Sequence, residues 1–310
     1  MQSAMQLPPD VLDWLRAVFS SCNERIAFKL SDAPNTHEES LDLTFIETFS
    51  HHESPVTLPS GWTLRFETHF IGGMRHWRER WEIADIGLLV MLRIAGRGLV
   101  SKVALLQSKR LYPDEIDFDG NAHFEYMIGF RRLFEQDSEW AEVVKPRALN
   151  FDEDSKYKAF FVEDPQYKAI KDYEESKGMP VYYLFYNPAE LPWAVQLPLT
   201  HGRKKASVCK IGCRVVPASN VRSALSGAKE GASPTYKELH AAVPQTSLSY
   251  PENWRLEDFA VDLLLSCQTG RIARDPDDYG LRQVFYRRSG PIWSAVAITV
   301  DAPEGFELSE

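Results

Sequence analysis

Apolar and polar positions recur along the chain in two ways, and each way predicts a different kind of element. Apolar spacings of three and four residues predict amphipathic helices, whereas alternation or a short apolar run predicts a strand. Helical spacing occurs at residues 10–22, 35–50, 121–136, 167–178, 218–228 and 255–267. Strand patterns occur at residues 25–32, 62–71, 81–94, 101–111, 179–188 and 207–218. Residues 281–300 are expected to form a hairpin that turns at Ser289-Gly290.

This mixed order of helices and strands predicts an α/β or α+β fold. A stretch rich in Gly, Ala, Ser and Pro at 226–234 is the best candidate for a domain boundary. We therefore expect one domain over residues 1–225. Residues 235–310 are expected to be a C-terminal α+β extension with a regulatory or partner-binding role.

The composition describes a folded protein with an acidic balance. Of the 310 residues, 44% are hydrophobic, which is typical of a globular chain. The net charge is -9, from 35 basic and 44 acidic residues. A protein that coats nucleic acid through its overall charge would be basic. Contact with a polyanion therefore requires a local patch or a partner.

Cysteine usage and hydropathy point to the cytoplasm. Four cysteines in a chain of this size fit a reducing compartment. Cys209 and Cys213 form a single C-x3-C pair, so buried thiols are favoured over a four-ligand zinc site. The first residues lack the pattern of a signal peptide. The longest apolar stretch is broken by Asp85 and Arg93, and we expect no membrane span.

Polar chemistry gathers at the end of the strand predicted at 101–111. Alternation puts Gln107 and Lys109 on one face of this strand and Ser108 on the other. The preceding strand carries Asp85 among Ile and Leu residues, where a carboxylate is costly unless it is paired or binds a metal. A short AGRG turn joins the two strands, so an antiparallel hairpin would bring Asp85 near Lys109. Arg110 faces the other way, and we expect no chemical role for it.

A helix before these strands offers a further carboxylate. Leu41, Phe45, Ile46 and Phe49 form its apolar arc, and Glu38 and Asp42 fall inside that arc. Glu38 is placed to reach inward from the first turn of the helix. Glu39 lies at the margin of the arc and remains an alternative.

A helix carboxylate, a strand Asp and a Q-x-K strand in this order resemble the PD-(D/E)xK nuclease superfamily. The tripeptide Gln107-Ser108-Lys109 is most similar to the Mrr-type restriction endonuclease branch, where Gln replaces an acidic residue. Asp85 stands in "IADIG" where that branch has a motif like "GAD(I/L)G", so Ile83 departs from the Gly. The resemblance covers residues 30–112 and implies a restriction-endonuclease-like mixed sheet flanked by helices.

The resemblance implies a metal-dependent endonuclease that cleaves DNA. Glu38, Asp85 and the Gln107 carbonyl would supply oxygen ligands for Mg²⁺ or Mn²⁺, and Lys109 would orient water or stabilise charge on the phosphate. The amide of Gln107 carries one negative charge fewer than a carboxylate, so the site is expected to hold metal more weakly. The resemblance also implies a bacterial antiviral defence or restriction system.

Three questions about partners remain open at this point. The chain has no P-loop, so an ATP-driven step would need a helicase or ATPase subunit. Two cuts across a duplex would favour a homodimer. Basic loops offer candidate DNA contacts, although solvated loops are the ordinary explanation; they contain Arg75, Arg78, Arg80, Arg203, Lys204 and Lys205.

The alternative function is a catalytically silent nuclease-fold subunit that binds nucleic acid or a partner protein.

Overall fold

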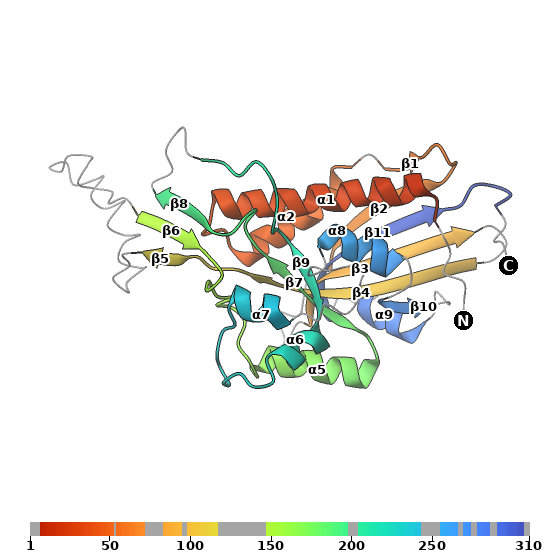
Figure 1. Cartoon of the computed structure of the whole chain (residues 1–310). Helices are drawn as coiled ribbons and strands as arrows, with labels where there is room; N and C mark the ends of the chain where they lie inside the picture. Colours follow the sequence, from red (N-terminus) through yellow and green to blue (C-terminus); the bar gives the residue numbers. More distant parts are fainter. Residues whose placement is uncertain are drawn as a thin grey trace, which may run out of the picture.

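An antiparallel pair of long strands lies at the centre of the main sheet (Figure 1). The computed structural model describes residues 7–52, 54–71, 83–94, 98–116, 147–197, 204–242, 255–265, 269–273, 278–285 and 290–306. Strands β3 (Ala84–Ile94) and β4 (Gly98–Arg110) pair with Ile86 opposite Leu106. The two predicted strands and their antiparallel pairing are therefore confirmed.

The described residues place eight strands in this sheet, which is mixed. Its order is β1–β2–β11–β3–β4–β7–β9, and β10 pairs with β4. β4 is parallel to β7, and β11 is parallel to β3 but antiparallel to β2. The further strands are β1 (Val56–Thr57), β2 (Thr63–Phe70), β7 (Val181–Tyr186), β9 (Arg214–Pro217), β10 (Arg271–Ala273) and β11 (Ile292–Asp301). A smaller antiparallel sheet contains β5 (Asp114–Ile116), β6 (Arg147–Phe151) and β8 (Trp193–Leu197).

Helices flank the main sheet on both sides, so the fold is mixed α/β. Figure 1 shows α1 (Pro9–Asp32) and α2 (Glu38–Ser50) on one side, and α5 (Pro165–Lys177) and α6 (Ala218–Ala224) on the other. The remaining described helices are α7 (Tyr236–Ala242), α8 (Leu256–Asp258), the π-helix η1 (Phe259–Leu265) and α9 (Tyr279–Phe285). No described helix has the length and apolar character that crossing a membrane requires.

Two predicted strand segments are helical in the structure. Residues 25–32 were expected to be extended, but they continue α1. The alternation of Ile26, Phe28 and Leu30 imitates a strand, whereas burial follows a helical stripe in which Cys22, Ile26 and Leu30 are four residues apart. The hairpin expected at 281–300 is also wrong. Its first part belongs to α9, and its second part is β11, which pairs with β2 and β3.

The C-terminal part of the chain contributes to the same sheet as the N-terminal part. We predicted an extension over residues 235–310, yet β11 of this segment lies between β2 and β3 in the interior of the sheet. The helical segment α8–η1 packs on α1. Residues from both predicted segments also share one hydrophobic cluster. The helix predicted at 121–136 lies outside the described residues.

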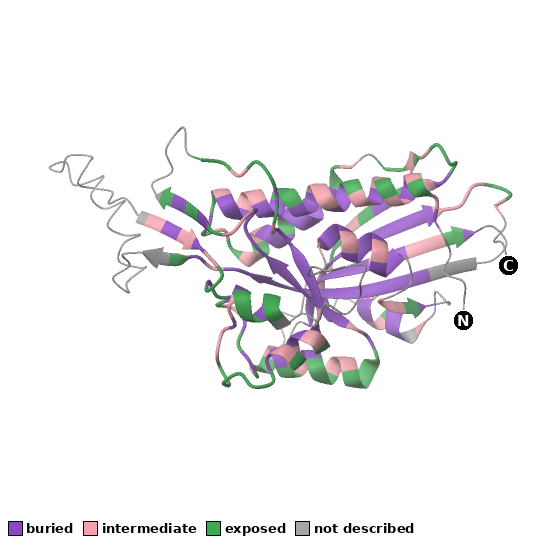
Figure 2. Cartoon of the chain, viewed as in Figure 1, coloured by how far each residue is buried: buried purple, intermediate pink, exposed green. Residues whose placement is uncertain are grey.

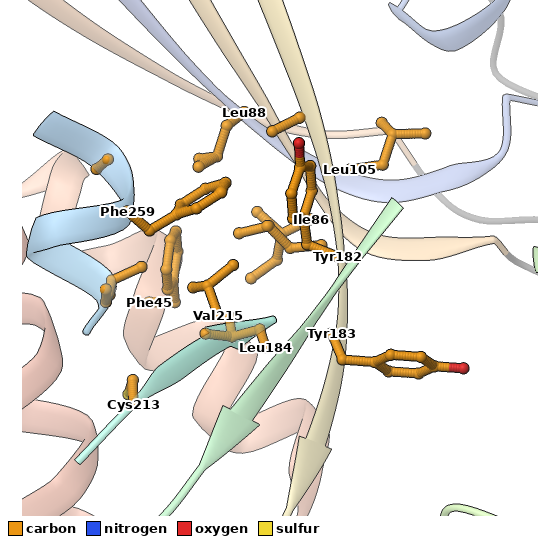
Figure 3. Close-up of a cluster of buried hydrophobic side chains, with 14 of the residues drawn as sticks. Phe45, Ile86, Leu88, Leu105, Tyr182, Tyr183, Leu184, Cys213, Val215 and Phe259 are labelled. Carbon is orange, nitrogen blue, oxygen red and sulfur yellow. The ribbon is translucent and has the colours of Figure 1, made fainter. Parts of the chain in front are cut away.

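The core lies between the sheet and the helices on the α2 side. Figure 2 shows the central strands buried along most of their length. In the close-up, Phe45 of α2 and Phe259 of η1 pack with Tyr182 and Leu184 of β7 (Figure 3). Tyr183 points away from this cluster, toward Phe160 on the opposite face. The alternation along β7 thus fills both faces of the sheet.

Candidate active site

The candidate site lies where β4 runs past the start of β3. The ladder between these strands ends at Ile86 and Leu106, while β4 continues beside β7 as far as Arg110 opposite Tyr186. Beyond Leu106, the backbone N–H groups of β4 that point to the β3 side need other acceptors. The N–H of Ser108 donates to Oδ2 of Asp85 at 2.7 Å, and the N–H of Arg110 donates to Oε2 of Glu38 at 2.9 Å. Carboxylates therefore take the place of a neighbouring strand.

Asp85 accepts several hydrogen bonds on one oxygen. Oδ2 receives the Ser108 hydroxyl at 2.9 Å, the Ser108 N–H and the Nε2 amide of Gln107. Burial raises the pKa of Asp85, and the charge of Lys109 and the bonds from Ser108 oppose this rise. Among the described residues, the hydrogen bonds to this side chain end on Oδ2, so Oδ1 is the oxygen that remains for a ligand.

Glu38 and Lys109 form a shielded ion pair. Nζ of Lys109 lies 3.4 Å from Oε1 of Glu38, and the side chains are 6% and 20% exposed. Burial raises the pKa of Glu38, and the charge of Lys109 opposes this. Burial would lower the pKa of Lys109, but the carboxylates of Glu38 and Asp85 outweigh that effect and raise it. Lys109 is therefore a cation at neutral pH. Glu38 is the helix carboxylate that contacts β4, whereas Glu39 is exposed.

Gln107 presents an unsatisfied carbonyl oxygen. Its Nε2 donates to Asp85, but its buried Oε1 has no hydrogen-bond partner among the described residues. An orphaned buried acceptor is costly unless a water or an ion completes it. Together with Asp85 and Glu38, this oxygen forms an all-oxygen donor set, which is the set that Mg²⁺ and Mn²⁺ prefer. The residues thus fit a hard divalent cation in their chemistry.

Asp42 belongs to the same cluster, although its sequence position did not single it out as a site residue. It is buried one turn after Glu38 on α2. Its Oδ2 lies 3.0 Å from the Ser108 hydroxyl, and its Oδ1 accepts the Tyr186 hydroxyl at 2.7 Å. Burial, and then the charge of Asp85, raises the pKa of Asp42 well above its usual range. The available signal was an acidic residue inside the apolar arc of the helix.

Arg110 fixes the start of α2, a contribution that the alternation pattern did not reveal. Its guanidinium donates to the carbonyl oxygen of Pro34 at 2.9 Å and to that of Thr36. It also lies 3.9 Å above the ring of Tyr112. These contacts hold the segment between α1 and α2, and therefore the position of Glu38. Arg110 thus influences the site through the backbone of the segment that precedes Glu38.

The basic residues expected to contact DNA fall into two groups. Arg75, Arg78, Arg80 and Arg203 lie outside the described residues. Lys204 and Lys205 are described and exposed. Nζ of Lys204 lies 3.6 Å from Oε1 of Glu190 and 5.1 Å from the ring centre of Trp193. Among the described residues, Lys204 thus contacts the segment around β8 rather than Glu38 or Lys109.

In the part of the chain that the structure describes, no group of three or more His, Cys, Asp or Glu side chains is arranged to hold a metal ion. The oxygen set above comprises two such residues and an amide.

No protein-family model, no curated protein and no solved structure matches the chain.

Proposed function

We propose that the chain is a metal-dependent endonuclease that cleaves DNA phosphodiester bonds and has a restriction-endonuclease-like core. The observation that carries this proposal is the convergence of Glu38, Asp85, Gln107 and Lys109 at the end of β4. These residues come from α2, β3 and β4, the elements on which the PD-(D/E)xK resemblance relies. The cluster joins oxygen ligands for a metal to one cation, and both can stabilise the charge that develops during phosphodiester hydrolysis.

Asp85, Glu38 and Oε1 of Gln107 would hold the metal. When bound, Mg²⁺ or Mn²⁺ would polarise the phosphate and lower the pKa of a coordinated water. Among the described residues, the hydrogen bonds to the Asp85 side chain end on Oδ2, and Oε1 of Gln107 accepts none. Glu38 keeps its orientation through the Arg110 N–H. The protein therefore supports each ligand before any ion is present.

Lys109 would provide the positive charge next to the scissile phosphate. Its ammonium remains charged because Glu38 and Asp85 surround it. A shielded cation stabilises negative charge that develops on phosphate oxygens more strongly than an exposed one does. It can also donate a hydrogen bond to the attacking water, which orients the water for attack. Removal of Lys109 is thus expected to affect the chemical step rather than metal binding.

The biological setting is part of the proposal. The net charge of -9 disfavours DNA capture by overall charge, so delivery by a partner helicase or ATPase subunit is proposed. We also propose a cytoplasmic bacterial antiviral or restriction system, and a homodimer for cuts on both strands. The basic segments around Arg75–Arg80 and 203–205 would supply the local DNA contacts.

One observation favours the alternative of a silent nuclease-fold subunit. Before metal binds, the cluster is largely satisfied by its own contacts, because Lys109 pairs with Glu38 and Gln107 donates to Asp85. Apart from Oε1 of Gln107, such a network needs no metal to satisfy its polar groups. This alternative predicts DNA binding that weakens with salt, without cleavage, and no functional loss on Asp85→Ala.

The direct test incubates the purified chain with supercoiled plasmid and with linear DNA, in Mg²⁺, Mn²⁺ or chelator. Nicked or linear products that need the metal, and that Asp85→Asn abolishes, support the nuclease. Binding without products under all of these conditions supports the silent subunit. The matched control is Asp172→Asn, an exposed carboxylate on α5.

A further inference from the structure

A chain of four oxygen-bearing groups runs from the interior to Asp85. It starts at the Tyr186 hydroxyl, passes through Asp42 and the Ser108 hydroxyl, and ends at Oδ2 of Asp85. Tyr186, Asp42 and Ser108 are all buried, with Ser108 fully inaccessible. The three oxygen–oxygen distances are 2.7, 3.0 and 2.9 Å, and each falls within the range of a hydrogen bond.

Counting protons assigns a role to each group. Each of the three contacts requires one proton, but the Tyr186 and Ser108 hydroxyls supply only two. The third must reside on one of the two carboxyl groups. Oδ2 of Asp85 already accepts the Ser108 N–H and the Gln107 amide, so it acts as an acceptor. Asp42 is left as the group that donates to Ser108.

We propose that Asp42 is a positioning residue for Asp85 that acts through Ser108. As a neutral donor, Asp42 occupies the acceptor side of the Ser108 hydroxyl and thereby aims the Ser108 proton at Asp85. The hydrogen bonds of Asp42 in the described residues go to Ser108 and Tyr186, so its effect on Asp85 is indirect. This inference rests on the proposed function, because it assigns Asp85 as the metal ligand.

The test compares three variants by calorimetric titration with Mn²⁺ alone. Asp42→Asn is isosteric and can both donate to Ser108 and accept from Tyr186. We expect it to bind Mn²⁺ within about threefold of wild type, whereas Asp42→Ala and Ser108→Ala should bind about tenfold more weakly, as is typical for the supports of metal ligands. Tyr157→Phe is the stability control, because it removes a different buried tyrosine hydrogen bond, the one to Asn187. Its melting temperature should fall without a change in Mn²⁺ affinity.

Two results would overturn the inference. Wild-type affinity in a folded Asp42→Ala protein would show that Asp42 does not support Asp85. Equal losses in Asp42→Asn and Asp42→Ala would show that its charge, not its hydrogen bonding, is what matters.

If wild type binds no Mn²⁺, the proposed function fails, and crystal structures of the variants decide the inference separately. The contact between Ser108 Oγ and Asp85 Oδ2 should then persist in Asp42→Asn and be lost in Asp42→Ala. Its persistence in Asp42→Ala would refute the positioning role.

Discussion

The hydroxyl of Ser108 lies 2.9 Å from Oδ2 of Asp85, and the backbone N–H of the same serine lies 2.7 Å from the same oxygen. Ser108 thus binds Asp85 twice while it separates Gln107 from Lys109 in sequence. Beyond the last paired residues of β3 and β4, the Asp85 side chain therefore lies beside β4 and is held there by hydrogen bonds from β4. Placement of Asp85 beside the Q-x-K segment follows from where these strands diverge.

Position 107 is expected to control metal affinity. Gln107→Glu would add a third carboxylate to the oxygen set. It would also remove the hydrogen bond that the Gln107 amide donates to Asp85. We expect Mn²⁺ to bind about tenfold more tightly, because ligand charge dominates affinity at such sites. The metal-free protein should melt at a lower temperature, because like charges then meet in a shielded site. Calorimetric titration and thermal melts measure the two effects. Gln107→Leu, which offers no oxygen, is the control that should bind more weakly, and equal affinity in both variants would refute ligation at this position.

The protonation of Asp42 predicts a pH dependence of folding. Its pKa is raised in the folded state, so its contribution to stability is complete below the unfolded pKa of about 3.9 and is lost as pH rises through the folded pKa. Asp85, Glu38, Tyr186 and Lys109 are the ionisable groups that act on it. Urea unfolding of wild type and Asp42→Asn from pH 5 to 8 should show wild type losing stability relative to the variant, by at most about 1.4 kcal/mol per pH unit. Parallel curves would mean that Asp42 is ionised throughout.

Arg110 is expected to contribute more to stability than an exposed cation. Arg110→Ala leaves the carbonyl groups of Pro34 and Thr36 without their donor and removes the contact with Tyr112. We expect a loss of about 2–3 kcal/mol in the free energy of unfolding by urea. Lys171→Ala, at an exposed position of α5, should change it by less than about 0.5 kcal/mol. Similar values for both variants would show that the Arg110 contacts do not hold the α1–α2 segment.

Two glycines with positive φ provide a matched test of the packing around α1. A Cβ at Gly212 (φ +62) would lie 2.2 Å from Asn23 Oδ1 and 2.6 Å from Cys209 Sγ, whereas a Cβ at Gly178 (φ +59) meets nothing within 4 Å. Gly178→Ala should therefore cost only about 1 kcal/mol of backbone strain. Gly212→Ala should cost at least about 2 kcal/mol more, because Asn23 must also shift and it binds the Cys213 N–H and Glu257. Equal melting temperatures would contradict this packing.

Local patterns predicted an element correctly where only one kind of apolar periodicity, helical or strand-like, was present. The β3–β4 hairpin, the apolar β7 and the helix that ends at Gly178 all appear where apolar periodicity and turn residues place them. The strand predicted at residues 25–32 was wrong because alternating and helical apolar spacing coincide there, and the segment belongs to α1. The insertion of β11 between β2 and β3 joins segments about 200 residues apart, which no local pattern encodes.

The candidate site was predictable in its polar residues but not in its supports. Glu38, Asp85, Gln107 and Lys109 could be selected from spacing and from a family resemblance, and the structure brings all four together. The roles of Asp42, Ser108 and Arg110 depend on hydrogen bonds between elements. Those bonds follow from how α2 sits over the end of β4, which is a tertiary property.

The most direct test of the central proposal is plasmid cleavage by wild type and Lys109→Ala in Mg²⁺ or Mn²⁺. Lys109 is the group that we propose acts on the phosphate, so its loss should reduce the cleavage rate by about a hundredfold or more. Mn²⁺ affinity should stay within about tenfold of wild type, because Lys109 is not among the proposed ligands. Cleavage by Lys109→Ala at the wild-type rate, with both proteins folded, would contradict the assignment of this cluster as a nuclease site.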